Sequence, residues 1–96
     1  MSQKDTSISV LGDGGWGTTL SLLLAQKGFH VCLWGAFPGY VEQVRRTREN
    51  IKFLPGFKIP ENVELTPSLD RAYKASDILV IAVPAQHVRA VLQKIR

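Results

Sequence analysis

The stretch Val10–Thr19, VLGDGGWGTT, decides the fold that we expect for this chain. Four glycines stand within the six residues Gly12–Gly17, directly after a short apolar run. Glycine inside a helix or a strand costs about 0.5–1 kcal/mol relative to alanine, so such a cluster needs a compensating reason. A tight turn or the close approach of a ligand to the backbone would supply that reason.

Strands and helices are expected to alternate outward from this stretch. Residues 7–11 predict a short strand that the glycines end. Apolar residues then recur at helical spacing up to a glycine C-cap at Gly28, which predicts a helix with an apolar face made of Trp16, Leu20, Leu23 and Leu24. The run His30–Trp34 is apolar on both faces, as in a buried parallel strand.

The second half of the chain continues the alternation. Pro38 suits the first turn of a helix with an apolar face made of Tyr40, Val41 and Val44. Residues 51–62 contain Pro55, Gly56 and Pro60 and predict an irregular loop.

Beyond this loop we expect two further strand and helix pairs. Residues 63–66 predict a short strand, and Ser68 can cap a helix that continues through Tyr73. Asp77–Val83 predicts a buried strand that Pro84 ends, and Ala85–Arg96 predicts a helix with an apolar face made of Val88, Val91, Leu92 and Ile95.

This order predicts one α/β domain with a doubly wound, Rossmann-type parallel sheet. We expect four strands in the order 3-2-1-4, with His30–Trp34 and Asp77–Val83 on either side of the first strand. The glycine-rich stretch then lies at the carboxyl end of the first strand.

The spacing of Gly12, Gly14 and Gly17 fits G-x-G-x-x-G between a strand and a helix, the context in which this pattern indicates a dinucleotide site. Gly12 permits the tight turn, Gly14 lets a pyrophosphate approach, and Gly17 lets the helix pack close to the strand. The alternative is a glycine-rich turn without a ligand. A Walker A loop is excluded because no Lys-Ser or Lys-Thr follows the last glycine.

The ribose end of this expected site lacks its usual side chain. In such sites an acidic residue at the end of the second strand holds the ribose 2′-hydroxyl of NAD. Here no Asp or Glu occurs between Asp13 and Glu42, and Ala36 and Phe37 offer only an apolar surface for adenine. No arginine stands there for a 2′-phosphate, so the sequence leaves NAD and NADP open.

Composition excludes several other classes of protein. The net charge of +4 includes a basic group, Arg45, Arg46 and Arg48, which we interpret as a solvated helix face rather than a nucleic-acid site. A single cysteine, Cys32, lies in an apolar run and predicts a buried thiol, no disulfide and no metal site. Without disulfides, a signal peptide or a membrane span, a cytoplasmic location is expected.

Four stretches resemble the N-terminal part of glycerol-3-phosphate dehydrogenase, in the order and spacing of that family. They are LGDGGWGTTL, VCLWG, TRENIKFLPGFKIPENV and ASDILVIAVPAQHVRAVL. The resemblance implies that residues 1–96 are an incomplete dinucleotide-binding domain of an enzyme that interconverts glycerol 3-phosphate and dihydroxyacetone phosphate. It also implies that the helical C-terminal domain and its catalytic residues are absent from these residues.

Carried over by position, the resemblance implies contacts to NAD or NADP from Gly12, Asp13, Gly14, Gly15, Trp16, Gly17, Ala36, Phe37, Val83, Pro84 and His87. Val83, Pro84 and His87 would border the nicotinamide, and proton transfer by His87 or His30 is not expected. Three residues depart from the family: Gly15 replaces a serine or asparagine, Asp13 a small residue, and Ala36 a larger one. A carboxylate at position 13 should repel a pyrophosphate unless it points to solvent.

Two other functions fit the same residues. One is a related dehydrogenase with a different small substrate, which the FLPG loop argues against. The other is a stand-alone module that senses a dinucleotide and signals through a partner. The last strand would have an open edge, which could pair with a second copy of the chain.

Overall fold

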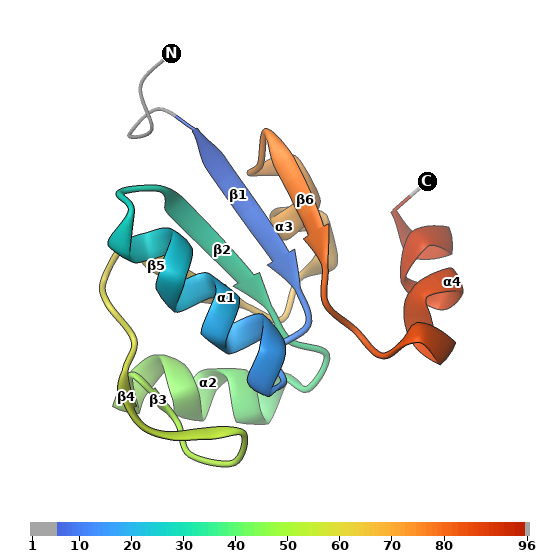
Figure 1. Ribbon diagram of the computed structural model, residues 1–96. Helices are drawn as coiled ribbons and strands as arrows, with labels where there is room; N and C mark the ends of the chain where they lie inside the picture. The colour runs from blue at the N-terminus through green and yellow to red at the C-terminus, as the bar shows by residue number, and fades with distance from the viewer. Residues whose placement is uncertain (1–5, 96) are drawn as a thin grey trace.

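The computed structural model describes residues 6–95. Its main sheet has four parallel strands (Figure 1). Their order is β5-β2-β1-β6, and their bounds are β1 Ser7–Leu11, β2 His30–Trp34, β5 Val63–Thr66 and β6 Ile78–Ile81. β2 and β6 pair with β1 on its two sides. Counted along the chain, this is the predicted order 3-2-1-4, which is confirmed.

Helices cover both faces of this sheet (Figure 1). Their bounds are α1 Gly15–Gln26, α2 Pro38–Thr47, α3 Leu69–Lys74 and α4 Ala85–Lys94. The side chain of Ser68 accepts a hydrogen bond from the backbone N–H of Arg71, so it caps α3 as predicted. Arg96, the expected last residue of the final helix, and residues 1–5 lie outside the described residues. No helix of residues 6–95 is long and apolar enough to cross a membrane.

The core has two parts, one on each face of the sheet. On one face, Val10 and Leu33 of the sheet pack against α1 and α2. Val41 and Val44, predicted for the apolar face of α2, are buried in this part of the core. On the opposite face the buried residues are Leu11, Cys32, Trp34, Ala72 of α3 and Val91 of α4. The prediction that Cys32 is a buried strand thiol is therefore confirmed.

The predicted apolar face of α1 is wrong for two of its four residues, whereas Leu24 packs against the core as predicted. The side chains of Trp16 and Leu23 are 68% and 50% exposed, whereas the buried residues of the helix are Gly17, Thr18, Ser21 and Ala25. These buried residues are small, which lets α1 lie close to the strands, while Leu22 and Leu24 are only partly buried against the core. Helical periodicity marks apolar positions, but here close approach selects small residues instead.

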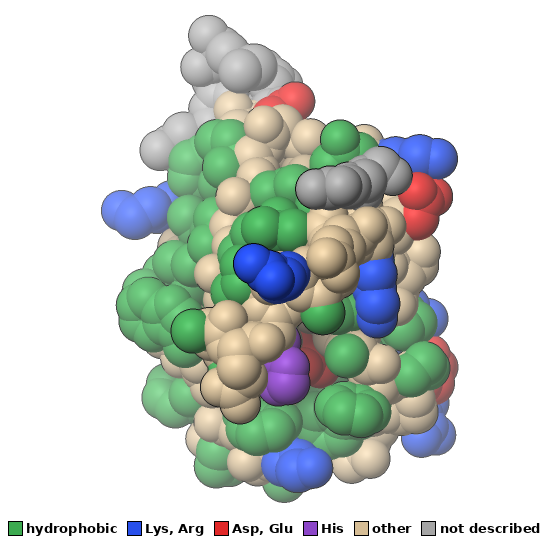
Figure 2. Space-filling model, turned by 90° about the vertical axis from the view of Figure 1, so that its right-hand side faces the viewer, with side chains coloured by type: hydrophobic (Ala, Val, Ile, Leu, Met, Phe, Trp, Pro, Cys, Tyr) green, Lys and Arg blue, Asp and Glu red, His purple; other side chains and the backbone are tan. Residues whose placement is uncertain are grey.

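β6 is less buried than its apolar sequence predicts. Ile78 is 49% and Ile81 37% exposed, and regular pairing covers only Ile78–Ile81 of the predicted strand Asp77–Val83. The reason is position, because within residues 6–95 this strand pairs with β1 alone and forms an edge. In α4 only Val91 is fully buried and Leu92 is exposed. Figure 2 shows apolar side chains at the surface on this side of the molecule.

The segment predicted as an irregular loop contains regular structure. β4, Leu54–Lys58, pairs antiparallel with β3, Glu49–Asn50, in a small second sheet. Pro55 and Gly56 hid this strand from the sequence analysis, because both residues are uncommon within strands. The hairpin projects beside α2 (Figure 1).

Arg48 corrects the interpretation of the basic group. Arg45 and Arg46 are exposed on α2 as predicted, but Arg48 ends the helix with a positive φ of 59°. Its guanidinium donates to the carbonyl oxygens of Ile59 (3.3 Å), Pro60 (2.5 Å) and Val63 (2.8 Å). This side chain therefore ties the chain after the β3–β4 hairpin to the domain.

Candidate functional site

The glycine turn, residues Gly12–Gly17, connects β1 to α1 at the carboxyl edge of the sheet. Gly12 has a positive φ of 128°, and a Cβ there would lie 2.9 Å from the carbonyl carbon and oxygen of Ala82. A Cβ on Gly17 would overlap with the carbonyl oxygen of Gly12. The backbone N–H of Gly12 also donates to the carbonyl oxygen of Trp34 (2.9 Å), which joins the turn to the end of β2. Gly12 and Gly17 are thus required by packing.

Gly14 has no such packing reason. An ideal Cβ at this position would meet no atom within 4 Å, so the residue borders open space. Gly14 is the N-cap of α1, where no side chain caps the helix and no acidic residue occupies the first turn. Free N–H groups and the positive end of the helix dipole favour an anion at such a place. The residues present therefore fit a bound phosphate group.

Gly15 and Trp16, also in the turn, differ in their surroundings. A Cβ on Gly15 would lie 3.2 Å from the carbonyl oxygen of Phe53, so the β3–β4 hairpin closes one side of the turn. Trp16 projects from the first turn of α1 and is mostly exposed.

A buried asparagine, Asn50, holds the turn in place and was missed by the sequence analysis. Its side-chain amide donates to the carbonyl oxygen of Asp13 (2.7 Å) and to Oγ1 of Thr18 (2.7 Å). Its own amide oxygen accepts a hydrogen bond from the hydroxyl of Tyr40. In the sequence the stretch REN, Arg48–Asn50, carries only a family resemblance, because no local pattern distinguishes a buried asparagine from a solvated one.

The end of β2 lies beside the turn. Ala36 and Phe37 follow Gly35 and are exposed, Phe37 at 73%. The carboxylate of Asp13 lies against Gly35, because a Cβ at position 35 would overlap with Oδ2 of Asp13. Burial raises the pKa of this carboxyl above its ordinary value, and its own backbone N–H and the charge of Lys52 oppose that shift. From the sequence we expect this carboxylate either to repel a pyrophosphate or to point to solvent. In the structure it does not point freely to solvent, because it is half-buried against the end of β2.

The remaining predicted residues follow β6. The backbone N–H of Val83 would lie 3.0 Å from a Cβ on Gly12, so Val83 borders the turn. Pro84 is the N-cap of α4, and its carbonyl oxygen accepts from the backbone N–H of His87 (2.8 Å). His87 is exposed. These residues contain no cluster of His, Cys, Asp or Glu that could hold a metal ion.

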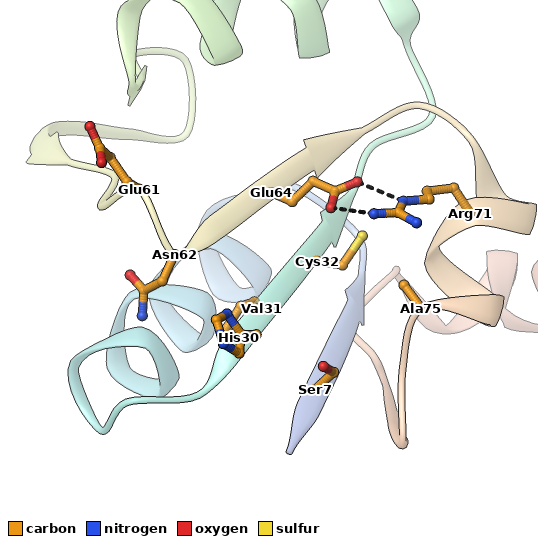
Figure 3. A pocket seen from close by; sticks show the side chains of 9 residues that line it. All are labelled: Ser7, His30, Val31, Cys32, Glu61, Asn62, Glu64, Arg71 and Ala75. Carbon is orange, nitrogen blue, oxygen red and sulfur yellow. Dashed lines mark hydrogen bonds and ion pairs between the residues drawn. The ribbon is translucent and has the colours of Figure 1, made fainter. Parts of the chain in front are cut away.

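A hollow of about 380 Å³ lies at the opposite end of the sheet (Figure 3). It is lined by the first residues of β1 and β2 and by Glu64 and Arg71, which form two hydrogen bonds of 2.9 Å. Arg71 lowers the pKa of Glu64, whereas burial and the charge of Glu64 raise the pKa of Cys32 to about 11. The Cys32 thiol is therefore protonated at neutral pH and is no nucleophile.

In this sheet order a glycine turn connects the carboxyl end of the central strand to a helix whose N-terminus has no side-chain cap. These features define a Rossmann-type nucleotide-binding domain. Residues 7–96 match the sequence model of the family described as NAD-dependent glycerol-3-phosphate dehydrogenase N-terminus. The chain belongs to that family.

Relatives and solved structures agree with this assignment. The chain is 45% identical over 86 residues to glycerol-3-phosphate dehydrogenase (NAD(P)+) of Prosthecochloris aestuarii, covering 90% of the chain and 26% of the relative. It is 48% identical over 89 residues to the enzyme of the same name from Carboxydothermus hydrogenoformans, covering 93% of the chain and 26% of that relative. The crystal structure of glycerol-3-phosphate dehydrogenase from Coxiella burnetii superposes with a TM-score of 0.88 at 30% identity, over 93% of this chain and 27% of that one. The chain thus spans about a quarter of the length of these relatives.

Proposed function

We propose that this chain is the dinucleotide-binding part of a glycerol-3-phosphate dehydrogenase, which interconverts sn-glycerol 3-phosphate and dihydroxyacetone phosphate. The observation that carries the proposal is the open side of Gly14 at the uncapped N-terminus of α1. Packing explains the absence of a side chain at Gly12 and Gly17 but leaves Gly14 unexplained. The close approach of a pyrophosphate would explain it.

The predicted contact residues divide into three groups around this point. Gly12–Gly17 would surround the pyrophosphate, with Trp16 at its exposed side. Ala36 and Phe37, exposed beyond β2, would border the adenine. Val83, which lies beside Gly12, would border the nicotinamide together with Pro84 and His87. When bound, NAD or NADP would accept or supply the hydride. The role of these residues would be to bind and orient the dinucleotide.

The rest of the enzyme would supply substrate binding and catalysis. We propose that residues 1–96 are the N-terminal, incomplete dinucleotide-binding domain, with a helical C-terminal domain as its partner in the same enzyme. The exposed apolar residues of the edge strand β6, Ile78 and Ile81, and of α4, Leu92, suit coverage by further protein, either from that enzyme or from a second copy of this chain. We expect the enzyme to work in the cytoplasm, in keeping with the single, unpaired cysteine of this chain.

Calorimetric titration with NADH and NADPH tests this proposal. We expect saturable binding of at least one of them at micromolar to millimolar concentration. We also expect no turnover of dihydroxyacetone phosphate, because hydride transfer needs the carbonyl held about 3–3.5 Å from the nicotinamide by groups outside this chain. If neither dinucleotide binds at millimolar concentration, the glycine turn is purely structural and the proposal is wrong. Appreciable turnover would refute the assignment of catalysis to the rest of the enzyme.

A further inference from the structure

The end of β2 carries no acidic residue of its own, yet the fold places a carboxylate there. Rossmann-type sites that bind NAD use an Asp or Glu at this point, about 20 residues after the glycines. In this chain the corresponding residues are Gly35, Ala36 and Phe37. The carboxylate that lies against Gly35 comes instead from Asp13, inside the glycine turn.

Two features hold Asp13 in this position. Its backbone carbonyl oxygen accepts hydrogen bonds from the amide of Asn50 (2.7 Å) and from Oγ1 of Thr18 (3.2 Å). Its side chain occupies the space that a side chain at position 35 would fill, where a Cβ would overlap with Oδ2 of Asp13 and lie 2.7 Å from Cγ2 of Val41. Glycine at position 35 and aspartate at position 13 are therefore sterically matched.

The carboxylate of Asp13 is available to a ligand. No side chain of residues 6–95 donates a hydrogen bond to it, and it is neither fully buried nor ion-paired. The cation whose charge acts on it is Lys52, whose Nζ lies 5.9 Å from the ring centroid of Tyr40 and 5.6 Å from that of Phe53. Lys52 thus lies over two aromatic rings rather than in an ion pair with Asp13.

We propose that Asp13 accepts a hydrogen bond from the 2′-hydroxyl of the adenosine ribose and so selects NAD(H) over NADP(H). This inference rests on the proposed function, because it concerns the same dinucleotide. A carboxylate accepts strongly from a hydroxyl, and it repels a 2′-phosphate that occupies the same place. Asp13 would thereby replace the acidic residue that the end of β2 lacks.

The test compares three probes: NADH, NADPH and the analogue of NADH with 2′-deoxyadenosine. The unmodified chain should bind NADH at least tenfold more tightly than either of the other two. In Asp13→Ala and in Asp13→Asn the affinities for NADH and NADPH should differ by less than about threefold. Glu61→Ala, which removes an exposed carboxylate at the distant hollow, should keep the full preference.

A second measurement needs no substitution. The carboxyl carbon signal of Asp13 in a ¹³C NMR spectrum should shift when NADH binds, and should shift much less with the 2′-deoxy analogue. Equal affinity of the unmodified chain for NADH and NADPH, preference for NADPH, or a preference that survives in both variants would overturn the role of Asp13 while leaving dinucleotide binding intact. Failure of all three probes to bind would overturn the proposed function and this inference together.

Discussion

Replacing Gly17 with alanine should lower the free energy of unfolding by about 3 kcal/mol or more, the upper end of the usual cost of overpacking. The added methyl group would overlap with the carbonyl oxygen of Gly12, which is backbone and cannot rotate away. α1 would have to move off β1, and its buried small residues Thr18, Ser21 and Ala25 would lose their contacts. A small domain has a total stability near the lower end of about 5–15 kcal/mol, so such a loss leaves little folded protein.

Urea unfolding followed by far-UV circular dichroism measures this effect. Gly39→Ala is the matched control, because Gly39 also lies in a helix but a Cβ there would meet no atom within 4 Å. That variant should be as stable as the unmodified chain, or more stable by up to about 1 kcal/mol. Equal midpoints for Gly17→Ala and Gly39→Ala would show that close packing of α1 does not depend on Gly17.

Replacing Gly14 with alanine should weaken NADH binding at least tenfold and leave the fold intact. The methyl group would project into open space, and the φ of −69° at this residue suits alanine. Because Gly14 is the N-cap, we expect a loss of stability of no more than about 1 kcal/mol. The loss of affinity would come from the methyl group standing where a phosphate approaches the backbone.

Tryptophan fluorescence during titration with NADH measures the binding. Trp16 lies in the same turn and is exposed, whereas the other tryptophan, Trp34, is buried and donates a hydrogen bond to the carbonyl oxygen of Pro67. Subtracting the response of Trp16→Phe therefore isolates the signal of the turn. Glu61→Ala should bind like the unmodified chain, since Glu61 lines the hollow at the far end of the sheet. Equal affinities of the unmodified chain and Gly14→Ala would mean that the turn is structural.

The sheet order and most elements could be predicted because they depend on local pattern. The apolar runs of β1 and β2, the proline at the start of α2 and the serine cap of α3 each determine one element, and parallel connections then restrict the topology. The glycine spacing located the candidate site for the same reason, because its steric requirements act between residues only a few positions apart.

What could not be predicted depends on contacts between distant residues. Small residues face the sheet in α1 because of how near the strands lie, and Arg48 is held by carbonyl groups 11 to 15 residues further on. The contact between the Asp13 side chain and Gly35 likewise connects residues that follow two different strands, β1 and β2. In the sequence the missing acidic residue after β2 and the unusual Asp13 are separate features, and only the fold brings them together.

The most direct test of the central claim, that the glycine turn binds a dinucleotide, is to map NADH binding by amide chemical shifts in ¹⁵N–¹H NMR spectra. We predict the largest changes at Asp13–Trp16, at Gly35–Phe37 and at Val83, all at the carboxyl edge of the sheet. Residues around the hollow, such as Asn62, Glu64 and Arg71, should change little. Changes confined to the hollow, or no changes at millimolar NADH and NADPH, would contradict the account.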